Sequence, residues 1–241
     1  MWCGKFIKTA VFTFVTIFSM PVLSAGLQVT PIMLDINQSQ PSDGIWLVNT
    51  SNSTLHAQVR VFAWSQQGQQ DVLESTPHFV ASPPLVKVDA GQRQFVRLVR
   101  VGNLENHQEQ AYRIVVDELP LESEGDSGLT FVLRYSIPVF IQGTEEKQEP
   151  VLNFHVTRND QNEAVLVVAN RGNTRAQISR LSFTQTNGKT TVLNEGLVGY
   201  ALADSTNQLV ISSNPGLFTS GGVFNVSVNG AEQQISVSAL Q

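Results

Sequence analysis

Cysteine is nearly absent from this sequence. The sequence also has no excess of basic over acidic residues. The one cysteine among the 241 residues, Cys3, lies within the first 25 residues. If that segment is removed from the mature chain, disulfides, thiolate metal sites and cysteine nucleophiles are excluded. The 15 basic residues are outnumbered by 20 acidic ones, and the net charge is −5. Nucleic-acid-binding domains typically carry a basic footprint, so this charge disfavours nucleic acid as a partner.

The sequence also lacks the residue clusters that mark enzymes and metalloproteins. Four histidines are scattered along the chain: His56, His78, His107 and His155. None lies two or four residues from another, and there is no G-x-S-x-G elbow or glycine-rich phosphate loop. Asp117 and Glu118 are adjacent, so on a strand they face opposite sides and cannot act as an acid/base pair. We expect a protein that is not an enzyme and that uses no metal, cofactor or small-molecule substrate.

The first 25 residues have the pattern of a secretory signal peptide. Lys5 and Lys8 precede an apolar run from Thr9 to Met20, and small residues follow up to Ala25. The apolar run is too short to span a membrane. Cleavage is expected after Ser24 or Ala25, with Ala25 favoured. Because the leader contains two lysines and no acidic residue, its removal would bring the net charge to −7.

Alternating apolar and polar residues, separated by turn residues, dominate the rest of the chain, and no long amphipathic helix is found. Strands are predicted in the first half at 27–34, 44–48, 55–64, 71–74, 86–88, 93–101, 110–118 and 129–141. In the second half they are predicted at 151–157, 163–170, 174–183, 190–198, 207–212 and 222–239. Asn187-Gly188 and Asn229-Gly230 are strong hairpin signals, since the favoured tight turn needs positive φ at both central residues.

This pattern predicts an all-β protein made of two immunoglobulin-like β-sandwich domains joined by a short linker. The first domain is expected at 26–142 and the second at 150–241. The segment 143–149 is polar and charged and is followed by Pro150, as is typical of a linker.

The predicted strand 129–141 is unusually long and carries an apolar residue at every odd position. Alternate side chains of a strand point to opposite faces, so one face is a continuous apolar ridge. Pro138 cannot donate a hydrogen bond to a central ladder, which favours a sheet edge or a strand end. A long apolar edge promotes aggregation, so the strand is either buried by its own domain or kept for a partner.

Several segments in order resemble the PapD-like family of periplasmic pilus-assembly chaperones. They are Ala81-Ser82-Pro83-Pro84, Asp89-Ala90-Gly91-Gln92 with Phe95-Val96-Arg97-Leu98, and Tyr112 to Pro120. The similarity covers residues 27–142 well, and the second domain mainly by its length and β character. The resemblance implies a periplasmic chaperone that folds and caps pilus (fimbrial) subunits and delivers them to an outer-membrane usher. Such chaperones lend a β-strand to an incomplete subunit, a form of strand addition.

On this resemblance the strand at 129–141 is the lent strand. Leu129, Phe131 and Leu133 would fill subunit pockets, with Tyr135 next in the same row, while Ile137, Val139 and Ile141 would root the strand in its own domain. Burial of one large apolar side chain contributes roughly 1.5–3 kcal/mol, so three could decide subunit capture.

The sequence departs from the well-known branch of the family at the anchor for the subunit's C-terminal carboxylate. The arginine and lysine of that branch fall at Pro31 and Pro138, which resembles the branch called archaic. A carboxylate still needs a cation. From the expected strand directions, the candidates near the linker end of the domain are Arg113 first, Arg100 second and Arg134 third. The alternative for each is an exposed surface arginine.

The resemblance also implies a structural ion pair. The family counterpart of Arg97 pairs with an acid on the neighbouring strand, and that position corresponds to Glu118 here. This pair would be buried and would hold the geometry of the domains.

Other functions remain open from the residues alone. The main alternative is a secreted two-domain immunoglobulin-like protein that binds or adheres to sugar or protein. A secreted β-sandwich hydrolase ranks lower because no catalytic cluster is present. A pilus subunit is disfavoured because subunits are usually single incomplete domains, often with cysteines.

Overall fold

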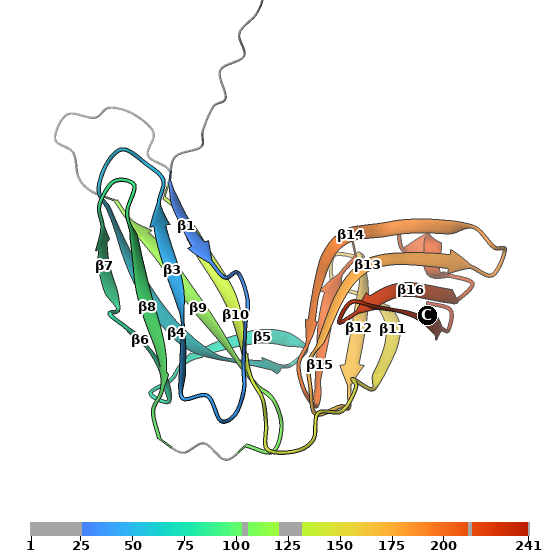
Figure 1. Ribbon diagram of the computed structural model, residues 1–241. Helices are drawn as coiled ribbons and strands as arrows, with labels where there is room; N and C mark the ends of the chain where they lie inside the picture. The colour runs from blue at the N-terminus through green and yellow to red at the C-terminus, as the bar shows by residue number, and fades with distance from the viewer. Residues whose placement is uncertain (1–25, 103–105, 121–131, 212–213, 241) are drawn as a thin grey trace, which may run out of the picture.

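The computed structural model describes residues 26–102, 106–120, 132–211 and 214–240. Figure 1 shows two β-sandwiches set at an angle and joined at one end by a segment that runs between them. Ile141 ends the last strand of the first sandwich, and Leu152 begins the first strand of the second. In the described ranges no helix is long and apolar enough to cross a membrane. The predicted all-β, two-sandwich architecture is confirmed.

The described residues of the first sandwich form ten strands in two sheets. One sheet has the order β1 (Leu27–Thr30), β3 (Ser42–Asn49), β8 (Arg93–Arg100) and β6 (Phe79–Ser82). The facing sheet has the order β2 (Leu34–Ile36), β10 (Arg134–Ile141), β9 (Gln110–Leu119), β4 (Leu55–Gln67) and β5 (Gln70–Ser75), with β7 (Leu85–Val88) also paired to β4. The inner faces meet in one apolar core that includes Ile45, Leu98, Ile114 and Val139. Removing these side chains from water is the main stabilising term.

The predicted strand at 27–34 is divided between the two sheets. β1 pairs antiparallel with β3, whereas β2 pairs parallel with the end of β10. The break falls at Pro31–Met33, because Pro31 has no amide hydrogen with which to continue the β1 ladder. The expectation of one continuous strand was therefore wrong here.

In the second sandwich, the part of the chain that the structure describes forms seven strands and one short 3₁₀ helix. Its sheets are β11 (Leu152–Arg158), β12 (Ala164–Asn170) and β15 (Ser205–Val210), facing β14 (Thr190–Ala201), β13 (Ala176–Gln185), β16 (Gly222–Val228) and β17 (Ala231–Val237). The 3₁₀ helix is η1 (Pro215–Phe218). Phe183 packs against Phe218 and Phe224 with ring centroids 4.8 and 4.9 Å apart, spacings at which aromatic pairs attract. This core is separate from that of the first sandwich.

A third apolar cluster joins the two sandwiches. Trp64 and Phe140 of the first pack against Tyr200 and Leu202 of the second. The Tyr200 ring centroid lies 5.5 Å from that of Trp64 and 5.6 Å from that of Phe140. The two sandwiches therefore share a small aromatic core beside the linker, and this core borders the candidate site.

Candidate functional site: an open strand edge and an interdomain cleft

The strand β10 leaves part of one edge without a partner. On one side, β9 pairs with β10 along its whole length from Arg134 to Ile141. On the other side, β2 pairs only with Val139–Ile141. In the part of the chain that the structure describes, residues 134–138 thus have no strand on this side. Backbone groups of such an edge can pair with a strand from another chain.

The apolar row of β10 is divided by its burial. Ile137, Val139 and Ile141 are buried in the core of the first sandwich, as the sequence predicted. Tyr135 is partly buried against the same core, and its hydroxyl donates a hydrogen bond to the carbonyl oxygen of Leu27. Leu133, by contrast, is exposed. The row therefore passes from the protein's own core to the surface between Tyr135 and Leu133.

The remaining predicted donor residues, Leu129 and Phe131, lie outside the described residues. Among the described residues, the strand β10 begins at Arg134, and the amide of Glu118 donates to the carbonyl oxygen of Leu133, just before the strand, at 2.9 Å. Val132 is exposed like Leu133. Two consecutive apolar side chains are thus open to solvent where the described part of the strand begins.

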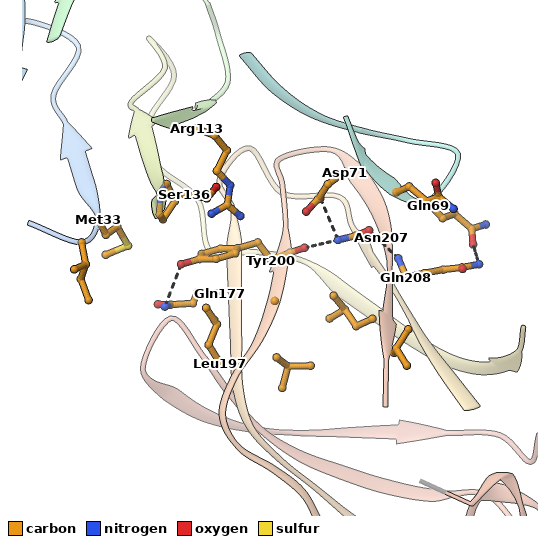
Figure 2. A pocket seen from close by; sticks show the side chains of 17 residues that line it. Met33, Gln69, Asp71, Arg113, Ser136, Gln177, Leu197, Tyr200, Asn207 and Gln208 are labelled. Atoms are coloured by element: carbon orange, nitrogen blue, oxygen red, sulfur yellow. Dashed lines mark hydrogen bonds between the residues drawn. The ribbon is translucent and has the colours of Figure 1, made fainter. Parts of the chain in front are cut away.

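A cleft of about 840 Å³ lies between the sandwiches. We call this the interdomain cleft. Its lining consists of Ile32, Met33, Gln69, Gln70, Asp71, Arg113, Ser136, Pro138, Gln177, Leu197, Val198, Gly199, Tyr200, Asn207, Gln208, Leu209 and Val210. Ser136 and Pro138 belong to β10, so the cleft begins beside the open strand edge. Figure 2 shows Arg113, Tyr200 and Asp71 grouped inside it.

Arg113 is the only one of the three candidate anchors that lines this cleft. On β9 it lies opposite Pro138 of β10. The Cζ atom of its guanidinium is 3.8 Å from the ring centroid of Trp64 and 5.7 Å from that of Tyr200, within the range of cation–π attraction. Among the described residues, no hydrogen bond or ion pair reaches this guanidinium. Loss of contact with water lowers the pKa of Arg113, and Asp71 and Tyr200 oppose that change.

The other two candidate arginines are engaged elsewhere. The Nη1 atom of Arg100 donates to the carbonyl oxygen of Gln38 at 2.5 Å, in a shallow pocket away from the interdomain cleft. Arg134 stands at the start of β10 and pairs with Asp117, which also binds Arg60 at 2.6 Å. Burial opposes ionisation of Asp117, but the two arginines outweigh it and lower the pKa of this carboxyl. Of the three candidate arginines, only Arg113 has no hydrogen-bond or ion-pair partner among the described residues.

The structure does not bring Arg97 and Glu118 together, so the predicted ion pair needs correction. Arg97 lies on β8, in the sheet that faces β9, and its side chain is exposed. Glu118 lies on β9, and its Oε2 atom accepts a hydrogen bond from the amide of Leu133 at 3.3 Å. The prediction took β8 and β9 as neighbours in one sheet, whereas they belong to opposite sheets.

An ion-pair group that the sequence did not suggest connects the two sandwiches. Arg175 precedes β13, and its side chain is only 13% exposed. Its Nη1 atom lies 2.6 Å from Oε2 of Glu109, its backbone amide donates to Oε1 of Glu109 at 2.9 Å, and its Nη2 atom contacts Asp35. Its Cζ atom is 3.7 Å from the ring centroid of Phe140. We call Asp35, Glu109 and Arg175 the interdomain ion group.

The hairpin of β4 and β5 provides a second polar connection. The side chain of Gln66 donates to the carbonyl oxygen of Tyr200 at 2.9 Å and accepts from the amide of Leu202 at 2.9 Å. The amide of Gln208 donates to the carbonyl oxygen of Gln69 at 3.0 Å. In Figure 1 this hairpin reaches from the first sandwich to β15 of the second. Hydrogen bonds between the two sandwiches therefore border the interdomain cleft, so the linker is not their only connection.

The described residues contain no group of three or more histidines, cysteines or carboxylates that could hold a metal ion.

Comparison with known proteins relates the chain to a protein family. Residues 26–145 match the family model of the pili and flagellar-assembly chaperone, PapD N-terminal domain. Comparison with curated protein sequences gave no match.

Solved structures resemble the chain over nearly its whole length. One is the complex of the chaperone CsuC with the tip adhesion subunit CsuE, from the archaic chaperone–usher Csu pili of Acinetobacter baumannii. It is 29% identical with a TM-score of 0.68, covering 90% of this chain and 100% of that chain. The Salmonella enterica complex of SafA pilin with the SafB chaperone is 15% identical, with a TM-score of 0.58 and coverage of 88% and 95%. The E. coli chaperone DraB is 16% identical, with a TM-score of 0.55 and coverage of 90% and 97%. The chain belongs to the PapD-like family of pilus-assembly chaperones.

Proposed function

We propose that this chaperone captures pilus subunits in the periplasm by donor-strand complementation and passes them to an outer-membrane usher. The observation that carries the proposal is the edge of β10 that has no strand partner among the described residues, and this edge leads from the interdomain cleft to the exposed Leu133. A subunit strand added along this edge would gain main-chain hydrogen bonds. The related CsuC structure, a complex of a chaperone with a pilus subunit, supports the same kind of partner.

In this proposal the side chains of Leu129, Phe131 and Leu133 enter the subunit, and Tyr135 marks the change to the chaperone's own core. Leu129 and Phe131 enter the proposal through the sequence alternation alone. Arg113 binds the C-terminal carboxylate of the subunit, because it is a cation in the interdomain cleft with no anionic partner among the described residues. Partial burial makes an unpaired cation costly, and an arriving carboxylate would offset that cost.

The test is a double substitution in the lent strand, Phe131→Asp with Leu133→Asp. The variant and the parent chain are each co-expressed with subunits encoded by neighbouring genes, and co-purification from the periplasm is measured. We expect the variant to lose the subunit while keeping the thermal unfolding curve of the parent. Leu85→Asp is the matched control, because Leu85 is an exposed apolar residue of the same sandwich on β7, away from β10. Undiminished co-purification with the double variant would refute the strand assignment.

A secreted immunoglobulin-like binding protein is the remaining alternative. It predicts neighbouring genes that do not encode a large outer-membrane barrel with small secreted β proteins. The proposed function predicts that both are present, and inspection of the genome decides between them.

A further inference from the structure

The apolar core of the first sandwich does not extend to the start of β10. Ile137 is buried in that core and Tyr135 is partly buried against it, whereas the next residue of the same row, Leu133, is 43% exposed. Arg134 and Val132 are exposed as well. Among the described residues β9 is the only strand that pairs with this stretch, so little apolar burial holds it in the sheet. A strand start of this kind opens locally at a low free-energy cost.

Polar bonds to two adjacent residues of β9 hold the strand where the apolar burial ends. The backbone amide of Glu118 donates to the carbonyl oxygen of Leu133 at 2.9 Å, and the amide of Leu133 donates to Oε2 of Glu118 at 3.3 Å. The Nε atom of Arg134 donates to Oδ1 of Asp117. The attachment of Leu133 and Arg134 to the sheet therefore depends on two carboxylate side chains as well as on the backbone.

Asp117 is itself fixed by a second arginine. Its Oδ2 atom accepts a hydrogen bond from the Nη2 atom of Arg60 on β4 at 2.6 Å, so each carboxylate oxygen binds one arginine. The Cζ atom of Arg60 also lies 5.6 Å from the ring centroid of Phe62. The Asp117 side chain is only 13% exposed, and charge-assisted bonds to such a carboxylate are stronger than those of a fully exposed pair. We call Arg60, Asp117 and Arg134 the strand-start ion group.

This ion group lies on the outer face of its sheet. Val116 is buried in the core and Tyr135 packs against it, so their neighbours Asp117 and Arg134 point away from the core. The group crosses β4, β9 and β10, which are adjacent in the sheet. It therefore fastens the start of β10 without using the row of side chains that contains Leu133 and without covering the open edge.

We propose that Asp117 is a positioning residue for subunit capture, which acts through Arg134 to keep the start of β10 extended and paired with β9. The inference rests on the proposed function, in which a subunit strand is added along the open edge of β10. A segment that is already ordered loses less conformational entropy when a partner binds, so capture is stronger. Leu133 and the open edge are then presented to the subunit in one arrangement rather than in many.

Amide hydrogen exchange in the free chaperone, followed by NMR, measures the attachment directly. The bond to the carbonyl oxygen of Leu133 sets the alternation of the ladder, which directs the amides of Tyr135 and Val139 toward β9. Asp117→Ala and Arg134→Met should each speed exchange of the Tyr135 amide at least about fivefold, the upper range for one ion pair. Exchange of the Val139 amide, which lies in the buried part of β10, should not change. The double variant should exchange no faster than the quicker single variant, because both changes remove the same bond.

Subunit capture by the same variants tests the functional consequence. Each variant is co-expressed with the subunits encoded by neighbouring genes, and the ratio of co-purified subunit to chaperone is measured. We expect this ratio to fall at least about threefold for Asp117→Ala and for Arg134→Met, since the start of β10 must then be ordered at the moment of binding. Glu232→Ala is the matched control, because it removes an exposed ion pair with Arg180, 2.8 Å long, in the second sandwich. The control should change neither exchange at Tyr135 nor capture.

The outcomes separate this inference from the proposed function. Unchanged exchange at Tyr135 in Asp117→Ala would overturn the inference, and so would equally faster exchange at Val139, which would indicate a general loss of stability. Faster exchange at Tyr135 alone with undiminished capture would show that the ion group only stabilises the strand start; the positioning role would be overturned and the proposed function would stand. A parent chain that captures no subunit would overturn the proposed function and this inference together.

Discussion

Replacing Arg175 by methionine is expected to lower the free energy of unfolding by about 3–5 kcal/mol at pH 7. This is the usual loss when one partner of a buried ion pair is removed and the other charge stays buried. The side chain of Glu109 is only 6% exposed, and both its oxygens accept hydrogen bonds from Arg175. Methionine retains an unbranched apolar stem next to Phe140, so most of the loss should come from the charge.

The loss should depend on pH in a defined direction. Burial raises the pKa of Glu109 above its ordinary value of 4.5, and Arg175 opposes that rise. A carboxyl with a higher pKa in the folded state binds its proton more tightly there than in the unfolded state. The protein therefore loses stability as the pH rises from the pKa of the unfolded state to that of the folded state. Without Arg175 the pKa of Glu109 rises further and the cost at neutral pH grows. Below the unfolded pKa the carboxyl is protonated in both states, so the effect of Arg175→Met should shrink near pH 4.

Urea unfolding followed by circular dichroism at pH 7 and pH 4 measures both effects. Arg171→Met is the matched control, because Arg171 makes an exposed ion pair with Asp204 at 3.6 Å, and such pairs contribute at most about 1 kcal/mol. Adding Glu109→Gln to Arg175→Met should restore much of the stability, since the buried charge is then gone. A loss below 1 kcal/mol at pH 7, an equal loss at both pH values, or no recovery in the double variant would refute the reasoning.

Two further substitutions test the cleft and the linker. Arg113→Ala should leave the chaperone folded but let subunits be degraded in the periplasm, which an immunoblot of subunit levels measures; normal levels would remove Arg113 as the anchor. Gly143→Val should cost about 1–3 kcal/mol in urea unfolding, because a Cβ atom at Gly143 would lie 2.2 Å from the carbonyl oxygen of His107. A variant as stable as the parent would show that the start of the linker shifts freely.

The local pattern of the sequence predicted the fold class because alternation and turn residues act over short distances. Asn229 and Gly230 both have positive φ and join β16 to β17, as the hairpin signal predicted. Asn187-Gly188 is different, because only Gly188 is among the residues with positive φ, and the loop from Gln185 to Thr190 is longer than two residues. Asn187-Gly188 thus predicted the hairpin correctly, but its turn is not the two-residue turn that was expected.

The site was predictable where it depended on one strand and not where it depended on sheet membership. The burial of Ile137, Val139 and Ile141 followed from alternation alone. The pairing of Arg97 with Glu118 required β8 and β9 to be neighbours, and no local pattern determines that. Arg175 binds residues 66 and 140 positions away, from a loop with no periodic signal, so its partners could not be inferred from the sequence.

The crossing of the first strand from one sheet to the other sets the length of edge that β10 exposes. β2 covers only the last three residues of β10, because the chain before Leu34 has already turned away to join β3 as β1. If the chain crossed between the sheets two residues earlier, β2 could pair with two more residues of β10. The edge of β10 without a partner would then be two residues shorter. The position of Pro31–Met33 in the sequence therefore determines how many residues of β10 are left for another strand to pair with. Insertions or deletions in this segment should alter that length without touching β10 itself.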